Sequence, residues 1–226
     1  MSKDAYIINL EWFQDIDRCS KGEEITLNEN HYLASGVRRD CYCHPFENDL
    51  CIKIPKNKDG IKDCAREIYY MRQIEKRLNL QEYYYSQFVC TVETNKGLGY
   101  VYKLIRDTPS LKVSQTLEKV YIDAILANNS ELKAALDQKI NALKETLQKD
   151  KMLVSDLSPR NIAVQYLSED TFKLVLIDGM GRSNFLPFLD RLGWVSNKKV
   201  NAYFEKKLGN AITHFNDVYR YLTMSS

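Results

Sequence analysis

Two acids and an asparagine stand beside the apolar runs of one short segment of the chain. Asn161 follows Asp156 by five positions in "SDLSPRN", and Asp178 ends the apolar run "FKLVLID" and precedes Gly179. Carboxylate and amide oxygens suit Mg²⁺, a hard cation that proteins hold with one or two such ligands together with the phosphates of a substrate. The segment therefore predicts a magnesium site to which Asp156, Asn161 and Asp178 contribute oxygen atoms.

A single charge also interrupts an apolar run nearer the start of the chain. Lys53 lies within "LCIKI", residues 50–54, where its ammonium group would be costly unless it met an opposite charge. Apolar residues then recur three or four positions apart over residues 61–78, which predicts a helix. Glu67 lies on that helix and is the natural partner of Lys53, although a structural ion pair without a ligand explains the same two residues.

The part of the chain around these two residues reads as a sheet with one helix. "HYLASGVRRDCYCHP" predicts two strands joined by a turn at Ser35-Gly36 and stopped by Pro45. "FVCTVET" and "LGYVYKLI" predict a hairpin around the turn at residues 95–97. The run "DTPSLKVS" then reads as a connector, so we expect one lobe over residues 1–106 and a second over residues 107–226.

The second lobe reads as helical apart from one hairpin. Apolar residues over 131–148 predict an amphipathic helix. "NIAVQY" and "FKLVLID" predict a hairpin, and the last part of the chain predicts two helices separated by Gly209. The hairpin would hold the acids and the asparagine of the predicted magnesium site at the ends of its strands.

Composition and charge give no indication of a nucleic-acid partner. A hydrophobic content of 44% and a charged content of 27% are ordinary for a globular protein, and a net charge of +2 is too small to indicate nucleic acid or anionic lipid. We therefore expect no nucleic-acid partner. The segment "NKKVNAYFEKKL" leaves open a peripheral contact with a membrane, against the alternative of a packed terminal helix with a solvated lysine face.

The location of the protein follows from what the chain lacks. No window approaches the uncharged apolar length of a transmembrane helix, and acids interrupt the N-terminal region where a secretion signal needs an apolar run. We expect a cytoplasmic protein with no transmembrane segment. In that compartment the six cysteines read as reduced thiols.

In this order and spacing, the motifs resemble those of a protein kinase-like fold. Lys53 resembles the strand lysine, Glu67 the helix glutamate, "SDLSPRN" the catalytic loop and "DGMG" the metal-binding D-F-G motif. More narrowly, "SGVRRDCYCHP", "CIKI", "REIYYMRQI", "SDLSPRNI" and "LVLIDGMG" together are similar to the bacterial YrbL family, which is linked by name to the PhoP regulatory network. The resemblance implies a two-lobed α+β fold, with a sheet-rich N-lobe and a reduced helical C-lobe.

The resemblance also implies a role for each residue. Asp156 would position or deprotonate the acceptor hydroxyl group, and Asn161 and Asp178 would hold Mg²⁺ on ATP. Lys53, fixed by Glu67, would grip the α and β phosphates of the nucleotide. Gly36 and Arg38 of the N-lobe would also contact the phosphates, and Leu104 would contact the adenine.

The chain departs from the kinase pattern in its phosphate loop and in its second lobe. Of the G-x-G-x-x-G loop only Gly36 is present, and Arg38 and Arg39 behind it read equally as phosphate contacts or as solvated charges of an edge strand. The D-F-G motif lacks its phenylalanine. No A-P-E motif follows Asp178, which leaves little of the platform on which protein kinases bind peptides.

Two functions from different classes follow as expectations. The first is an ATP- and Mg²⁺-dependent phosphotransferase that moves the γ-phosphoryl group to a hydroxyl group of a small molecule, a glycan or lipid headgroup, or a protein. It is favoured because the base and both metal ligands are present. The second is a pseudokinase-like regulatory module that acts through a protein partner, and it is favoured by the reduced glycine loop and the shortened second lobe.

Overall fold

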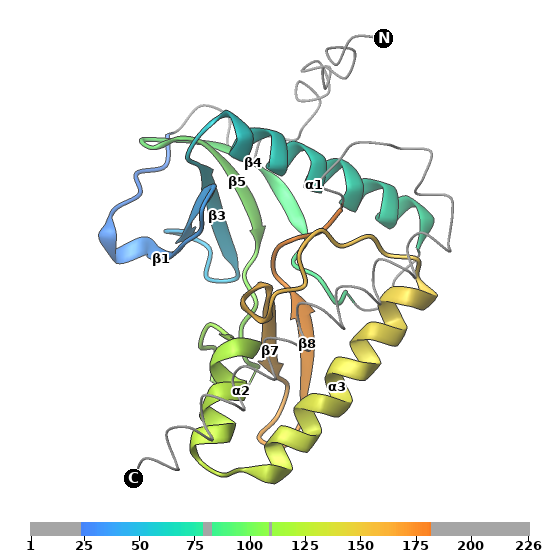
Figure 1. Ribbon diagram of the computed structural model, residues 1–226. Helices are drawn as coiled ribbons and strands as arrows, with labels where there is room; N and C mark the ends of the chain where they lie inside the picture. The colour runs from blue at the N-terminus through green and yellow to red at the C-terminus, as the bar shows by residue number, and fades with distance from the viewer. Residues whose placement is uncertain (1–23, 79–82, 109, 182–226) are drawn as a thin grey trace. The chain divides into compact units, whose positions relative to one another are not determined.

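The computed structural model describes residues 24–78, 83–108 and 110–181. These residues form two compact units (Figure 1). The first unit comprises residues 24–73 and 86–104, and the second comprises the remaining described residues. The two helices predicted on either side of Gly209, and the lysine-rich segment for which a membrane contact was left open, lie outside the described residues.

A five-stranded antiparallel sheet forms most of the first unit, with its strands in the order β1-β2-β3-β5-β4. The strands are β1 (Tyr32–Ser35), β2 (Arg39–Cys43), β3 (Leu50–Pro55), β4 (Phe88–Thr94) and β5 (Gly97–Lys103). These bounds confirm both of the predicted strand–turn–strand segments and the predicted strand that contains the single lysine.

The two faces of this sheet carry different side chains, because successive side chains of a strand point to opposite faces. On one face, Ile52 of β3 belongs to a buried apolar cluster with Tyr42 of β2 and Val101 of β5. On the other face, Lys53 of β3 lies opposite Tyr100 of β5. The single charge of this strand therefore lies on the face away from the apolar cluster.

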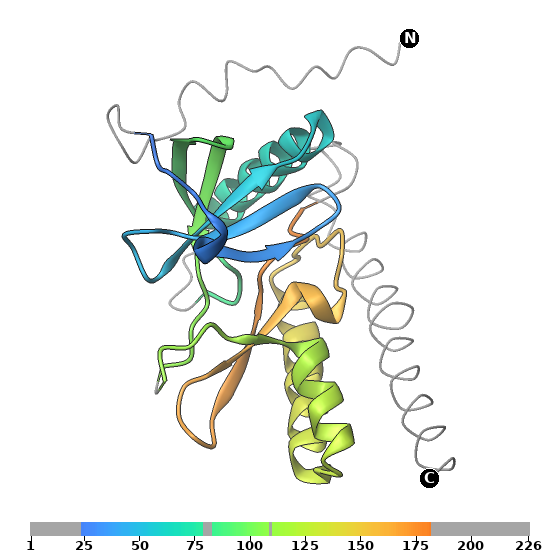
Figure 2. The same ribbon diagram turned by 90° about the vertical axis from the view of Figure 1, so that its left-hand side faces the viewer.

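The helix α1 (Lys58–Arg77) lies along the face of the sheet that carries the lysine (Figure 1, Figure 2). Asn57 caps its first turn, since Oδ1 accepts a hydrogen bond from the backbone N–H of Gly60 at 2.9 Å. Its buried apolar side chains recur at helical spacing and include Cys64, Ile68, Met71 and Ile74. The predicted helix is thereby confirmed.

The second unit contains a small sheet and two helices. Its three antiparallel strands lie in the order β6-β7-β8. The elements are β6 (Gln115–Thr116), α2 (Leu117–Leu126), α3 (Ser130–Lys149), β7 (Ile162–Tyr166) and β8 (Phe172–Leu176). The predicted hairpin is confirmed, and β6 extends it by a short strand that the sequence patterns did not indicate.

The helices α2 and α3 lie side by side (Figure 2). Asn129 caps α3, since its Oδ1 accepts a hydrogen bond from the backbone N–H of Leu132 at 2.9 Å. The side chains that α3 buries are Leu136, Ile140, Leu143 and Leu147. They belong to the apolar set from which this helix was predicted, and its bounds confirm the prediction.

Antiparallel sheets and separate helices make this an α+β protein with a sheet-rich N-terminal part, as predicted. No helix among the described residues combines the length and the apolar character needed to cross a membrane.

The cysteines differ in their covalent state. Four of those described carry free thiols: Cys41, Cys43, Cys51 and Cys64. Cys90 is disulfide-bonded, so the prediction that all six cysteines are reduced is wrong at this position. A hydrogen bond with Cys41 and burial together raise the pKa of the Cys51 thiol well above its ordinary value, which keeps this thiol protonated at neutral pH.

Candidate functional site

Asp156 lies in the loop that precedes β7. Its Oδ1 accepts a hydrogen bond from the backbone N–H of Ser158 at 3.1 Å, which orients the carboxylate against its own loop. Asn161 ends the 3-10 turn of this loop, and its Nδ2 donates to the backbone carbonyl oxygen of Asp156 at 3.3 Å. This hydrogen bond fixes the amide group, and its oxygen Oδ1 is the acceptor atom with which an asparagine can bind a cation.

Asp178 lies just beyond the end of β8, and its Oδ1 accepts a hydrogen bond from the backbone N–H of Gly179 at 2.7 Å. Gly179 has a φ of 81°, in the left-handed region that favours glycine. A Cβ atom at this position would also collide with the backbone carbonyl oxygen of Asp156. The close approach of the two segments therefore requires glycine where the kinase motif has phenylalanine.

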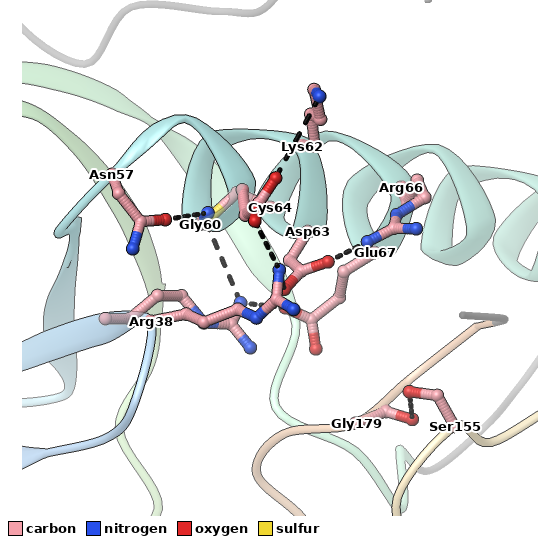
Figure 3. Close-up of polar contacts among 12 residues, drawn as sticks. Arg38, Asn57, Gly60, Lys62, Asp63, Cys64, Arg66, Glu67, Ser155 and Gly179 are labelled. Carbon is pink, nitrogen blue, oxygen red and sulfur yellow. Dashed lines mark hydrogen bonds and ion pairs between the residues drawn. The ribbon is translucent and has the colours of Figure 1, made fainter. Parts of the chain in front are cut away.

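Hydrogen bonds join the end of β8 to the loop that precedes β7. The carbonyl oxygen of Gly179 accepts from both the backbone N–H of Ser155, at 2.7 Å, and its hydroxyl group, at 3.0 Å (Figure 3). The backbone N–H of Ile177 donates to the carbonyl oxygen of Asn161 at 2.8 Å. One backbone network thus brings together all three residues of the predicted magnesium site.

In the first unit, Glu67 of α1 presents a carboxylate that is almost completely buried, with 4% of its side chain exposed. Nη1 of Arg39 lies 2.6 Å from Glu67 Oε2, and the hydroxyl group of Tyr102 donates to the same oxygen at 3.2 Å. Oε1 is buried and has no hydrogen-bond partner among the described residues. The structure thus pairs Glu67 with Arg39, a contact that the sequence analysis did not assign.

Lys53 lies on the same face of the sheet as these groups. Its Nζ lies 4.2 Å from the centroid of the Tyr102 ring, at the range of a cation–π contact. Cys41 of β2 lies opposite Lys53, and Arg39 precedes Cys41 by two residues, so both side chains belong to one face. Alternation along β2 places Arg39 on the face of Cys41, but the pairing with β3 that brings this face beside Lys53 has no signal in the sequence.

The three other predicted nucleotide contacts lie in the turns and loops of the first unit. Gly36 occupies the turn between β1 and β2, and Leu104 directly follows β5. Arg38 is half-exposed, and its Nη1 lies 3.3 Å from Asp63 Oδ2 and 3.6 Å from Asp59 Oδ2 (Figure 3). Arg38 is therefore paired with acids of α1, and the nucleotide contacts of all three residues stay predictions.

Comparisons with known proteins identify the family of the chain. Residues 25–210 match the family model described as PhoP regulatory network protein YrbL. Two relatives, from Escherichia coli strain K12 and from Shigella flexneri, are each named uncharacterized protein YrbL. Each is 30% identical to this chain over 191 residues, which cover 80% of this chain and 85% of the relative. The matched range contains every residue of the candidate site, and the chain belongs to the YrbL family.

Proposed function

We propose that this chain has a kinase-like fold and is an ATP- and Mg²⁺-dependent phosphotransferase. It would move the γ-phosphoryl group of ATP to a hydroxyl group of an acceptor, which is a small molecule, a glycan or lipid headgroup, or a protein. The observation that supports this most is the contact of Asn161 and Gly179 with the carbonyl oxygen of Asp156, which fixes the predicted base beside both predicted metal ligands. We place this activity in the cytoplasm, where ATP is available.

The donor set fits Mg²⁺. The ligands would be the Asn161 amide oxygen, left available by the hydrogen bond of its nitrogen, and the Asp178 carboxylate. Mg²⁺ is commonly held by one or two protein ligands and takes its other ligands from phosphate and water. When bound, Mg²⁺ would neutralise charge that develops on the β and γ phosphates.

The other roles follow from the local contacts. Asp156 accepts the proton of the acceptor hydroxyl group, and its hydrogen bond from Ser158 holds the carboxylate in one orientation for this step. In the first unit, Lys53 binds the α and β phosphates. Gly36 and Arg38 would contact phosphate, and Leu104 would contact the adenine. Ion pairs with two acids of α1 reduce the positive charge that Arg38 presents to a phosphate.

A regulatory module that acts through a protein partner is the second candidate. It is favoured by the turn between β1 and β2, where Gly36 is the one glycine and Arg38 is engaged with α1. The description of the family names the PhoP regulatory network, and a role in such a network suits this candidate directly. Nucleotide binding without any transfer to an acceptor would distinguish it from the phosphotransferase.

The proposal predicts binding of ATP that requires Mg²⁺ and Asp178. We expect Asp178→Ala to weaken binding of the Mg²⁺–ATP complex at least about 10-fold, because even the outer-shell partners of metal ligands contribute about 10- to 100-fold to metal affinity. Isothermal titration calorimetry with and without Mg²⁺ measures this change. The matched control is Asp170→Ala, which removes an exposed carboxylate between β7 and β8 and should bind as the wild type does. Absence of ATP binding by the folded wild-type protein would contradict the proposal.

A further inference from the structure

The buried Glu67 carboxylate uses only one of its oxygens. Arg39 and Tyr102 both contact Oε2, whereas Oε1 is buried without a hydrogen-bond partner among the described residues. A buried carboxylate oxygen without a donor costs free energy, so a site that keeps one is poised to bind a further donor. The structure therefore leaves Oε1 as the position at which a second cation or donor completes the coordination of this carboxylate.

The positive charge of Arg39 is directed to Glu67. The Arg39 side chain is 14% exposed, and its Nη1 lies 2.6 Å from Glu67 Oε2 and 3.7 Å from Cys64 Sγ. Burial raises the pKa of the Cys64 thiol to about 11, with the nearby Arg39 charge opposing this and the Glu67 charge adding to it. At neutral pH Cys64 is thus an uncharged thiol, and the acid that lies against Arg39 is Glu67.

Tyr102 connects this pair to Lys53. Its hydroxyl group donates to Glu67 Oε2 at 3.2 Å, and its ring centroid lies 4.2 Å from the Lys53 ammonium nitrogen. The contacts form a continuous series from Arg39 through Glu67 and Tyr102 to Lys53. An ammonium group on a flexible four-carbon side chain, held above this ring, is the donor that fits Glu67 Oε1.

We propose that Arg39 is a positioning residue for Lys53. Arg39 holds Glu67 by Oε2, and this fixes Oε1 as the acceptor that sets the position and the charge of the Lys53 ammonium group. The consequence for nucleotide binding rests on the proposed function, because Lys53 is the residue assigned there to the α and β phosphates. The proposal also separates the two adjacent arginines, since Arg38 pairs with acids of α1 at a half-exposed site.

The test measures the pKa of the Lys53 amine by nuclear magnetic resonance, in protein labelled with carbon-13 at the lysine Cε and with the signal assigned by its loss in Lys53→Met. Arg39→Gln should raise this pKa by about one unit, because the Glu67 carboxylate loses its other cation. Glu67→Gln should lower it by about two units, because Lys53 loses the countercharge at Oε1 and Arg39 is then an uncompensated like charge. The other titrating groups near Lys53 are common to all variants. They lie on β3 itself, on the adjoining strands and on α1: Cys51, Cys41, Tyr100, Tyr102 and Cys64.

A double variant keeps the test decisive if a single variant fails to fold, and a surface variant is the control. Arg39→Gln/Glu67→Gln leaves neither buried charge alone, and it should lower the Lys53 pKa by about one unit, less than Glu67→Gln does, because it removes the countercharge at Oε1 without leaving Arg39 as a like charge. Lys62→Gln removes an exposed positive charge from α1 and should leave the Lys53 pKa unchanged. A Lys53 pKa that is the same in the wild type and in the folded double variant would overturn the proposal.

A second arm measures binding of the Mg²⁺–ATP complex by calorimetry. The double variant should bind about 10-fold more weakly than the wild type. The single variant Arg39→Lys keeps the positive charge and should keep most of the wild-type affinity. Wild-type affinity in the folded double variant would overturn the role of Arg39 at the nucleotide. If the wild type binds no ATP, the proposed function fails while the Lys53 pKa still decides whether Arg39 positions Lys53.

Discussion

Gly179→Ala is expected to lower the free energy of unfolding by about 2–4 kcal/mol and to abolish binding of the Mg²⁺–ATP complex. A non-glycine residue at the φ of 81° costs about 1 kcal/mol or more. The added Cβ would also collide with the Asp156 carbonyl oxygen, and relieving an overpacked contact of this kind costs about 1–3 kcal/mol. The shift would separate Asp178 from the loop of Asp156, so metal binding would be lost together with stability. Urea denaturation and calorimetry measure the two effects.

Gly97→Ala is the matched control for this prediction. Gly97 has a φ of 100°, and nothing lies within 4 Å of the position that its Cβ would take. The variant therefore carries the backbone cost without the collision, so we expect a loss of about 1 kcal/mol and unchanged binding of Mg²⁺–ATP. If Gly97→Ala destabilised the protein as much as Gly179→Ala does, the contact with the Asp156 carbonyl oxygen would have no special part in the site.

The elements that carry the candidate site could be predicted from local patterns. The strand around Lys53 is buried on both faces and appears in the sequence as a short apolar run. The helix around Glu67 buries one face, which appears as a repeat of three to four residues. The hairpin was predicted in the same way, and it places Asn161 immediately before β7 and Asp178 just beyond β8. Short elements such as β6 were missed because two residues are too few to show a repeat.

The partner of Glu67 could not be predicted from the sequence. Lys53 was the obvious cation because it interrupts an apolar strand, whereas Arg39 begins β2 beside a second arginine in a segment with no apolar repeat. Its place beside Glu67 depends on how β2 pairs with β3 and on which face α1 covers, and both are long-range features. Sequence reasoning therefore left both Arg38 and Arg39 open, and the structure separates them.

The glycine after Asp178, in the second unit, shows the same limit. In the sequence, Asp-Gly after an apolar strand is the commonplace signal of a turn. The structure shows that Gly179 is required by a neighbour far away along the chain, the carbonyl oxygen of Asp156. Close packing between two loops therefore requires glycine at this position, where the D-F-G motif that the sequence resembles has phenylalanine.

Asp156→Asn is expected to reduce phosphoryl transfer by about 10²- to 10⁴-fold, the usual contribution of a general base, with little change in affinity for ATP. The substitution keeps a side-chain oxygen to accept the hydrogen bond of the Ser158 N–H, so the loop and its contact with Asn161 should be preserved. It removes the negative charge and with it the ability to take a proton. Release of ADP in the presence of a screen of hydroxyl acceptors measures transfer, and calorimetry measures binding.

Asp170→Asn is the control for this prediction, and phosphoryl transfer by the wild type decides between the two candidate functions. That variant changes an exposed acid in the turn of the β7–β8 hairpin and should transfer phosphate at the wild-type rate. If Asp156→Asn keeps wild-type turnover, Asp156 is not the base. If the wild type binds Mg²⁺–ATP but transfers nothing to any acceptor, the network around the Asp156 carbonyl oxygen serves to hold a nucleotide-bound shape. The chain would then act as a regulatory module whose partner binds this nucleotide-bound conformation.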